Sequence, residues 1–172
     1  MLKAGLGRAI LFVVPAAVLT IPVQAQVFPT AANFNVTITI VDECILTTPI
    51  ATLVFDTDAG VLTTPILGQT TITVQCTDGT DFKLELNEGT GVGATTTLRK
   101  MTGTGPNTAT IDYELFQEPT LTDNWGVDLD GEALVEQGTG AAVGYIVYGR
   151  VPAQATPMAD TYTDTITVTA LY

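Results

Sequence analysis

The stretch T-I-T-V-Q-C at residues 71–76, followed by D-F-K-L-E-L at 81–86, alternates polar and apolar side chains at every position. Two apolar rows result, formed by Ile72, Val74 and Cys76 in the first segment and by Phe82, Leu84 and Leu86 in the second. A two-residue period is typical of a strand with one buried face. The turn signal Asp78-Gly79 lies between the segments. This stretch therefore predicts two half-buried β-strands.

The same alternation recurs further along the chain. It is found at Ile111, Tyr113 and Leu115; at Val143, Tyr145, Val147 and Val151; and at Tyr162, Ile166, Val168, Ala170 and Tyr172. Turn signals separate these segments at Glu88-Gly89, 103–107, Asp130-Gly131 and 138–140. Past residue 25, no segment keeps a 3.6-residue apolar stripe over ten residues, so we expect very little helix. The pattern predicts an all-β fold, and we favour a sandwich over a barrel.

A further alternating stretch, Asn33 to Val41, lies near the N-terminus. Its apolar positions are Phe34, Val36, Ile38 and Ile40, with Asn35, Thr37 and Thr39 between them. This predicts a strand with a free end and an apolar face that must be buried somewhere. Our interpretation is that it is buried in another molecule.

Residues 1–25 have the build of a secretory signal peptide. Lys3 and Arg8 precede an apolar run from Ala9 to Ile21. The small-residue ending Val23-Gln24-Ala25 predicts cleavage after Ala25. Beyond it the chain holds no second run of about 20 apolar residues, so we expect no membrane insertion after cleavage. We therefore expect the mature protein to be soluble and exported.

The mature chain, residues 26–172, is long enough to form one domain with its own core. It carries four basic residues, Lys83, Arg99, Lys100 and Arg150, against 18 acidic ones, which gives a net charge of −14. So acidic a surface repels nucleic acid and anionic membranes. The simplest meaning of the acidity is solubility outside the cell.

Cys44 and Cys76 are the two cysteines of the chain. Export to an oxidising compartment makes their pairing the expected outcome, and we expect the bridge to tie two neighbouring strands together. In the chain-entropy account such a bridge stabilises by roughly 3 to 4 kcal/mol. A metal pair or a catalytic thiol is the rival interpretation, which the lack of histidine and of a C-x-x-C motif disfavours.

Catalytic chemistry has little support in this composition. The chain has no histidine and no serine, which excludes a Ser-His-Asp triad, a Cys-His pair and a histidine metal site. Asp123, Asp128 and Asp130 beside Trp125 could form a sugar-cleaving or calcium site, but a solvated acidic loop is favoured because the other ligands of a calcium loop are missing. We therefore predict a protein that is not an enzyme and needs no cofactor.

Taken in order, several motifs resemble one family. They are the apolar strand before Cys44, I-T-V-Q-C-T-D-G-T at 72–80 with F-K-L-E-L-N after it, L-R-K-M at 98–101, I-D-Y-E-L-F at 111–116, Trp125-Gly126, V-Y-G-R-V-P at 147–152 and D-T-Y-T-D-T-I-T-V-T-A-L-Y at 160–172. The mature chain resembles the spore coat protein U domain family, which includes the Csu-type archaic chaperone–usher pilins. The segment L-V-F-D at 53–56 departs from the expected L-x-F-G pattern, which puts the turn there in doubt.

The resemblance implies an incomplete immunoglobulin-like β-sandwich at residues 44–172, completed by a donor strand from another subunit. Residues 26–43 would be the donor segment, with Phe34, Val36, Ile38 and Ile40 as its anchors. The acceptor groove would be walled by the final strand, through Tyr162, Ile166, Val168 and Ala170. The implied partners are a periplasmic pilus chaperone, an outer-membrane usher and other pilin subunits.

The function that follows from the resemblance is that of a structural pilus subunit. It would be secreted through the periplasm into a cell-surface fimbrium that supports adhesion and biofilm formation. A spore or cyst coat protein, or a surface-binding protein of the same domain family, is the alternative. A secreted carbohydrate-active enzyme is a third hypothesis, disfavoured by the thin catalytic inventory.

Overall fold

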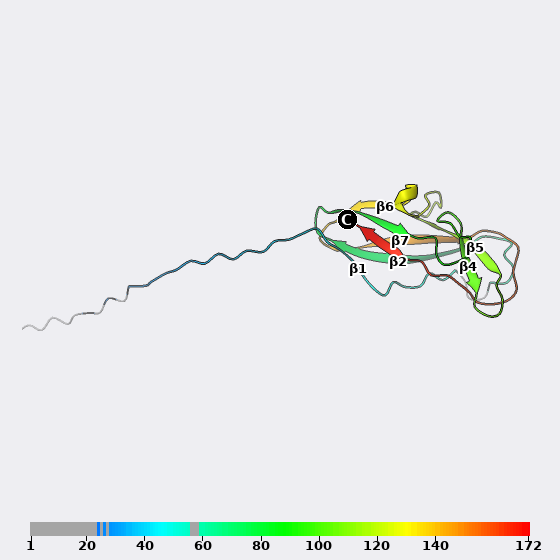
Figure 1. Cartoon of the computed structure of the whole chain (residues 1–172), viewed down its shortest axis with the longest axis horizontal. Coiled ribbons are helices and arrows are strands. Elements are labelled where there is room, and N and C mark those ends of the chain that lie inside the picture. Colours follow the sequence, from blue (N-terminus) through cyan, green and yellow to red (C-terminus); the bar gives the residue numbers. More distant parts are fainter. Residues whose placement is uncertain (1–23, 25, 27, 56–58) are drawn as a thin grey trace, which may run out of the picture. The chain divides into compact units, whose positions relative to one another are not determined.

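The structure is a computed structural model that describes residues 24, 26, 28–55 and 59–172. The predicted signal peptide, apart from Gln24, and Asp56 of the L-V-F-D segment lie outside the described residues. The chain divides into an N-terminal unit, Met1–Ile38, and a body, Thr39–Tyr172, and each is described by itself (Figure 1). In the described part no helix is both long and apolar enough to span a membrane.

The larger sheet of the body has six strands, and every neighbouring pair is antiparallel. From edge to edge they are β1 (Cys44–Leu46), β2 (Ile66–Cys76), β7 (Ala142–Val151), β5 (Thr110–Phe116), β4 (Arg99–Gly103) and β8 (Tyr162–Thr163). The pair β2–β7 forms the long centre of this sheet, with an unbroken register from Ile66 opposite Val151 to Gln75 opposite Ala142.

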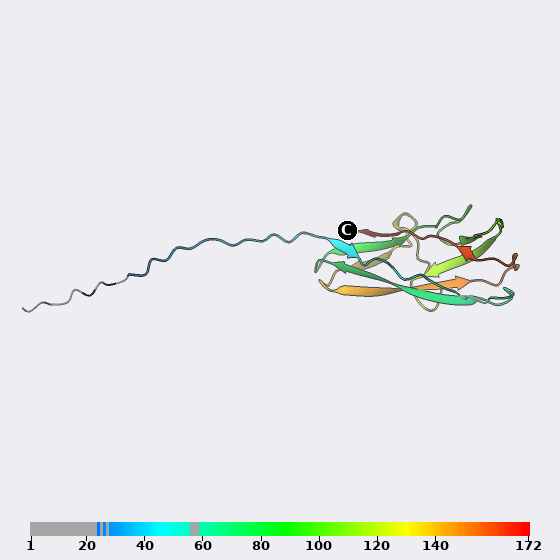
Figure 2. The same ribbon diagram turned by 90° about the horizontal axis from the view of Figure 1, so that it is seen from below.

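The smaller sheet has three antiparallel strands. Its order is β6 (Leu134–Gln137), β3 (Asp81–Leu86) and β9 (Val168–Leu171), and a 3-10 turn, η1 (Asp128–Asp130), precedes β6. Gly79, with a φ of 82°, forms the predicted turn, and there the chain passes from β2 in one sheet to β3 in the other. The strands of the body lie in two layers (Figure 2). The all-β sandwich expected from the alternation is confirmed, and it is immunoglobulin-like.

The alternating residues of the central strands fill the space between the layers. The buried core includes Ile72, Val74, Cys76, Phe82, Leu84, Leu86, Tyr113, Leu115, Trp125, Val147 and Val151. Each large apolar side chain buried in this way stabilises the fold by about 1.5 to 3 kcal/mol. A disulfide joins Cys44 to Cys76, directly opposite each other on β1 and β2, so the expected tie between neighbouring strands is present.

One expectation about strands was wrong, and another stays a prediction. The single C-terminal strand predicted from Tyr162 to Tyr172 is two strands in different sheets, β8 and β9, and Tyr172 is exposed rather than on the inner face. The interruption lies at Asp164, whose carboxylate is bound by groups from other segments. The stretch Asn33 to Val41 is not paired as a strand within the described chain. A strand needs a neighbour for its backbone hydrogen bonds, and the neighbour expected here lies in another molecule, so this strand stays a prediction.

Candidate functional site

The candidate site begins at β9, an edge strand whose hydrogen-bonded neighbour is β3. The carbonyl of Thr167 accepts a hydrogen bond from the Asn87 N–H, so the backbone groups of Thr167 and Thr169 face β3. The backbone N–H and C=O groups of Val168 and Ala170 consequently point to the other side of the strand, where no strand is paired within the described residues. We call this free side of β9 the open edge.

Apolar side chains accompany the open edge. Ile166, Val168 and Ala170 are half-buried and pack against the core, whereas the intervening Thr167 and Thr169 are exposed. The same alternate residues thus present both unpaired backbone groups and partly covered apolar side chains. An added strand would satisfy both deficits at once.

A second apolar row lies on β1 and the segment that follows it. Leu46, Ile50, Leu53 and Phe55 are partly buried and pack against the core. Cα atoms of β1 come within 8 Å of Cα atoms of β9, but the two strands belong to different sheets and are not hydrogen-bonded to each other. The edges of the two sheets therefore approach each other with half-covered apolar residues on both sides.

A cavity of about 690 Å³ lies between the segment after β1 and the segment that leads into β8. Its apolar lining includes Leu53, Phe55, Met101, Ile111, Val151 and Tyr162. Of the four residues predicted to form the acceptor groove, Tyr162 lines this cavity. Ile166, Val168 and Ala170 lie instead on β9 and its approach. The structure therefore distributes the predicted groove residues over two elements.

Two facing glycines shape the wall of the cavity. Gly68 on β2 lies opposite Gly149 on β7. A Cβ atom on Gly68 would come within 2.9 Å of the Val54 carbonyl oxygen, and one on Gly149 within 2.8 Å of the Phe55 ring. Phe55 also meets Tyr113 edge to face, with ring centroids 5.9 Å apart. The missing side chains let the segment that carries Phe55 lie directly on the sheet.

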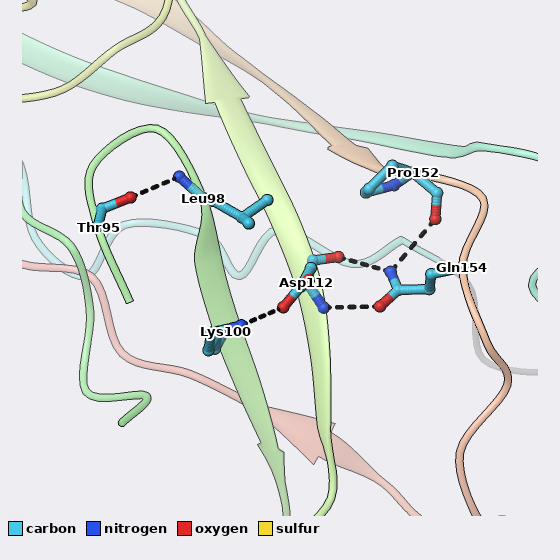
Figure 3. A network of polar contacts seen from close by, with 6 residues as sticks. All are labelled: Thr95, Leu98, Lys100, Asp112, Pro152 and Gln154. Atoms are coloured by element: carbon cyan, nitrogen blue, oxygen red, sulfur yellow. Dashed lines mark hydrogen bonds and ion pairs between the residues drawn. The ribbon is translucent and has the colours of Figure 1, made fainter. Parts of the chain in front are cut away.

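A polar network holds the other wall (Figure 3). Gln154, just after β7, accepts a hydrogen bond from the Asp112 N–H at 3.0 Å and donates one to the Asp112 carbonyl at 2.9 Å. The Asp112 carboxylate pairs with the Lys100 ammonium at 2.6 Å. The backbone N–H of Gln154 donates to the Leu62 carbonyl at 2.9 Å. Gln154 therefore ties the segment that leads into β8 to both β5 and the opposite wall.

Asp164 fixes the break between β8 and β9. Its carboxylate accepts hydrogen bonds at 2.7 Å from the Tyr113 hydroxyl and from both the N–H and the hydroxyl of Thr90. Burial, reinforced by the bond to Asp164, raises the pKa of Tyr113, so the phenol remains a donor. These contacts set where the apolar row of the open edge begins.

Arg99 supports the strand next to the open edge. Its guanidinium is fully buried and donates to backbone carbonyls that include those of Leu86, Asn87 and Trp125. Burial lowers the pKa of Arg99. Asn87, at the end of β3, is in turn hydrogen-bonded to Thr167, the residue just before β9. Arg99 therefore helps to fix the position where β9 begins to pair with β3.

The predicted donor segment carries the complementary feature. Its four anchors are exposed: Phe34 by 84%, Val36 by 85%, Ile38 by 82% and Ile40 by 68%. None of them belongs to the described core. The apolar face of this segment therefore has no partner within the described chain.

The acidic loop around Trp125 is held by contacts with β3. Asp128 pairs with Lys83 at 2.6 Å, and Trp125 is buried with its indole N–H donating to the Leu84 carbonyl. In the preceding turn, hydrogen bonds from the Thr120 hydroxyl and nearby N–H groups lower the pKa of Glu118 to about 2. Across the described ranges, no three His, Cys, Asp or Glu side chains are placed to hold a metal ion. The Asp128 carboxylate is therefore engaged by a lysine of β3.

The sequence analysis did not identify the cavity wall formed by the segment after β1, nor Asp164 and Arg99, which fix the position of β9. The alternation of Leu53 and Phe55 within A-T-L-V-F at 51–55 is a weak signal for the wall. Asp164 and Arg99 carry no comparable signal, because a charged residue is expected at the surface unless its partners are known.

Comparison with known proteins adds a family and a fold. The model of the Spore Coat Protein U domain matches residues 30–169. The chain is also similar to a crystal structure of the CsuC–CsuE chaperone–tip adhesion subunit pre-assembly complex from archaic chaperone–usher Csu pili of Acinetobacter baumannii, with 19% identity and a TM-score of 0.55. That match covers 78% of this chain and 41% of the other, so this chain spans less than half the length of that one. No curated protein matches it.

Proposed function

The chain belongs to the Spore Coat Protein U domain family, and on this premise we propose that it is a structural subunit of an archaic chaperone–usher pilus. It polymerises by donor-strand complementation, in which residues 26–43 of one subunit complete the sandwich of the next. It is secreted through the periplasm and acts in a cell-surface fimbrium that supports adhesion and biofilm formation. Its role is structural and involves no catalysis.

The observation that carries this proposal is the pairing of two deficits. The open edge of β9 has unpaired backbone groups and half-buried apolar residues at alternate positions. The donor segment has exposed apolar residues at the same two-residue spacing. In an immunoglobulin-like sandwich the last strand lies beside the strand that β9 represents, which supports the open edge as its place. Strand addition satisfies both deficits.

The energetics favour a fibre. Each donor anchor contributes about 1.5 to 3 kcal/mol when fully buried, before the cost of ordering the segment. The contact joins one end of a subunit to a different surface of the next, so it is heterologous and does not close into a ring. Repetition of such a contact gives a filament.

A chaperone is the partner expected before assembly. An apolar edge with free backbone groups invites aggregation unless another chain covers it. The similar structure is titled as a complex of a chaperone with a pilus subunit, which supports this assignment. We propose that a periplasmic chaperone covers the open edge and that an outer-membrane usher exchanges the chaperone for the next donor segment.

The donor role is tested by Val36→Asp with Asn35→Asp as the matched control. Both variants add one negative charge to neighbouring positions, but only the first places it on the apolar face. Val36→Asp should abolish surface fibres in electron micrographs while the exported subunit remains as abundant as the parent, because an unpaired charge would have to enter the next subunit. Asn35→Asp should keep its fibres. Equal effects of the two variants would contradict a one-sided donor strand.

The acceptor role is tested by Val168→Asp against Thr169→Asp, whose side chain is exposed on the other face of β9. Val168→Asp should lose capture by an affinity-tagged chaperone and be degraded, because the charge would enter the apolar row. Thr169→Asp should still be captured. Normal capture of Val168→Asp would mean that the open edge is not the binding site.

A coat protein is the second candidate, favoured by the name of the family itself. Electron microscopy of the producing cells separates the two roles. A pilus subunit gives thin fibres that vanish when the protein is deleted, whereas a coat protein gives a continuous layer.

A further inference from the structure

Most of the outward side of the central strands β2 and β7 carries no charged residue, the exception being Arg150 near the end of β7. Residues opposite the buried ones point away from the core, and their pairs across the two strands are in register. The uncharged part of this side, called here the outer face, consists of Ile45 on β1, Leu67, Gln69, Thr71, Thr73 and Gln75 on β2, and Ala142, Gly144, Ile146 and Tyr148 on β7. Three of its large apolar side chains are exposed: Ile45 by 59%, Leu67 by 60% and Ile146 by 39%.

Such a face stands out in a chain with 18 acidic residues. Arg150 shares this outward side, directly opposite Leu67, and is paired with Glu114 of β5 at 2.7 Å. Two copies of the protein repel each other wherever their acidic surfaces meet. From Gln69 to Gln75 and the β7 residues paired with them, two copies can meet without burying a charge, and threonine and glutamine side chains can hydrogen-bond across the contact.

The dimensions limit how strong one contact can be. The seven residue pairs from Gln69 opposite Tyr148 to Gln75 opposite Ala142 make a face about 23 Å long at roughly 3.3 Å per residue. Two strands about 5 Å apart, with the short β1 beside them, give it an area of about 300 Å² per copy, less than half of the ~800 Å² per partner in a standard stable complex. Single subunits should therefore remain apart, whereas fibres that repeat the face along their length gain avidity from many weak contacts.

We infer that the outer face of β2 and β7 is the surface through which assembled fibres associate side by side, and that its partner is the same face of a second copy. This inference rests on the proposed pilus function. The open edge of β9 belongs to the other sheet, so a subunit can be complemented by a donor strand and contact a second fibre at the same time.

The test uses the double variant Gln69→Glu with Thr71→Glu, which places two negative charges at the centre of the outer face. Both residues are exposed, and Gln→Glu preserves the shape of the side chain. The matched control is Thr63→Glu with Thr64→Glu, which adds the same charge at exposed positions of the loop before β2. Fibres sheared from cells are counted as single or bundled by electron microscopy and sedimented at low speed over a range of salt concentrations.

We expect the parent and the control to form bundles, increasingly so as salt screens the remaining acidic surface. The face variant should yield as many fibres as the parent but lose the bundles. Bundling of the face variant at the parent's level would overturn the inference, as would single parent fibres at every salt concentration or an equal loss in the control. A face variant that still forms bundles but no longer attaches to a polysaccharide or plastic surface would also overturn the inference, because the outer face would then bind that surface and not a second fibre. Absence of parent fibres would refute the pilus function itself, and the fibre count reports this separately from bundling.

Discussion

Three segments of this chain have almost the same sequence but lie in three different environments. T-I-T-V occurs at 71–74 and at 165–168, and T-I-T-I at 37–40. Ile72 is 1% exposed, Ile166 is half-buried and Ile38 is 82% exposed. The first lies in β2 between two neighbouring strands, the second leads into β9 with one neighbour, and the third has none in the described chain. Alternation thus predicts a strand, while the number of its neighbours depends on the rest of the fold.

The largest expected effect is at the segment with two neighbours. Ile72→Ala should lower the free energy of unfolding of the purified subunit by about 2 to 5 kcal/mol, because it removes buried methyl groups and leaves a cavity between the sheets. Urea denaturation measures the change. A loss under about 1 kcal/mol would mean that the core relaxes around the deletion.

The next effect distinguishes the two sheet edges. β1 is tied to β2 by the Cys44–Cys76 bridge, whereas β9 is held to β3 by hydrogen bonds and packing. Replacing both cysteines by alanine should destabilise the subunit by roughly 3 to 4 kcal/mol in the chain-entropy account. Thermal melting of this variant should resemble that of the reduced parent. Two free thiols in the denatured, unreduced parent would contradict the bridge.

Sequence alone predicted the strands that alternate polar and apolar residues without interruption. The alternation at Phe82, Leu84 and Leu86 gave β3 and its buried face directly. It could not show that the chain changes sheets at Gly79 or that Asp164 splits the last strand, because both depend on contacts between distant segments. Local periodicity carries no information about such contacts.

For the candidate site, sequence reasoning named the half-buried row of β9 but not the wall opposite it. Phe55 packs on the sheet because Gly149 leaves room there, and a lone glycine in a strand pattern does not reveal what covers it. Arg99 was counted among the surface charges, yet it is fully buried and its hydrogen bonds end on backbone carbonyls. Every residue has a backbone carbonyl, so the sequence does not indicate which carbonyls will accept hydrogen bonds from a buried arginine.

The third prediction concerns the segment with one neighbour. Ile166→Ala should cost the isolated subunit about 1 kcal/mol, less than a fully buried isoleucine, because much of its side chain is covered on one side only. When a synthetic peptide of residues 26–43 is bound, the cost should rise, since the added strand would bury the rest of the side chain. Differential scanning fluorimetry with and without the peptide measures both values, and Thr165→Ala serves as the control on the exposed face.

The smallest expected effect is at the segment with no neighbour. Ile38→Ala should leave the free energy of unfolding of the isolated subunit within about 0.5 kcal/mol of the parent, because an exposed side chain that packs against nothing contributes little to its own domain. The same substitution should weaken binding of the 26–43 peptide to a parent subunit, since burial of this isoleucine then occurs in the second molecule. Calorimetry of the peptide with and without the substitution measures that loss. A destabilised subunit together with unchanged peptide binding would show that T-I-T-I at 37–40 belongs to the core of its own domain. The segment would then have a neighbour within its own chain, contrary to the comparison made above.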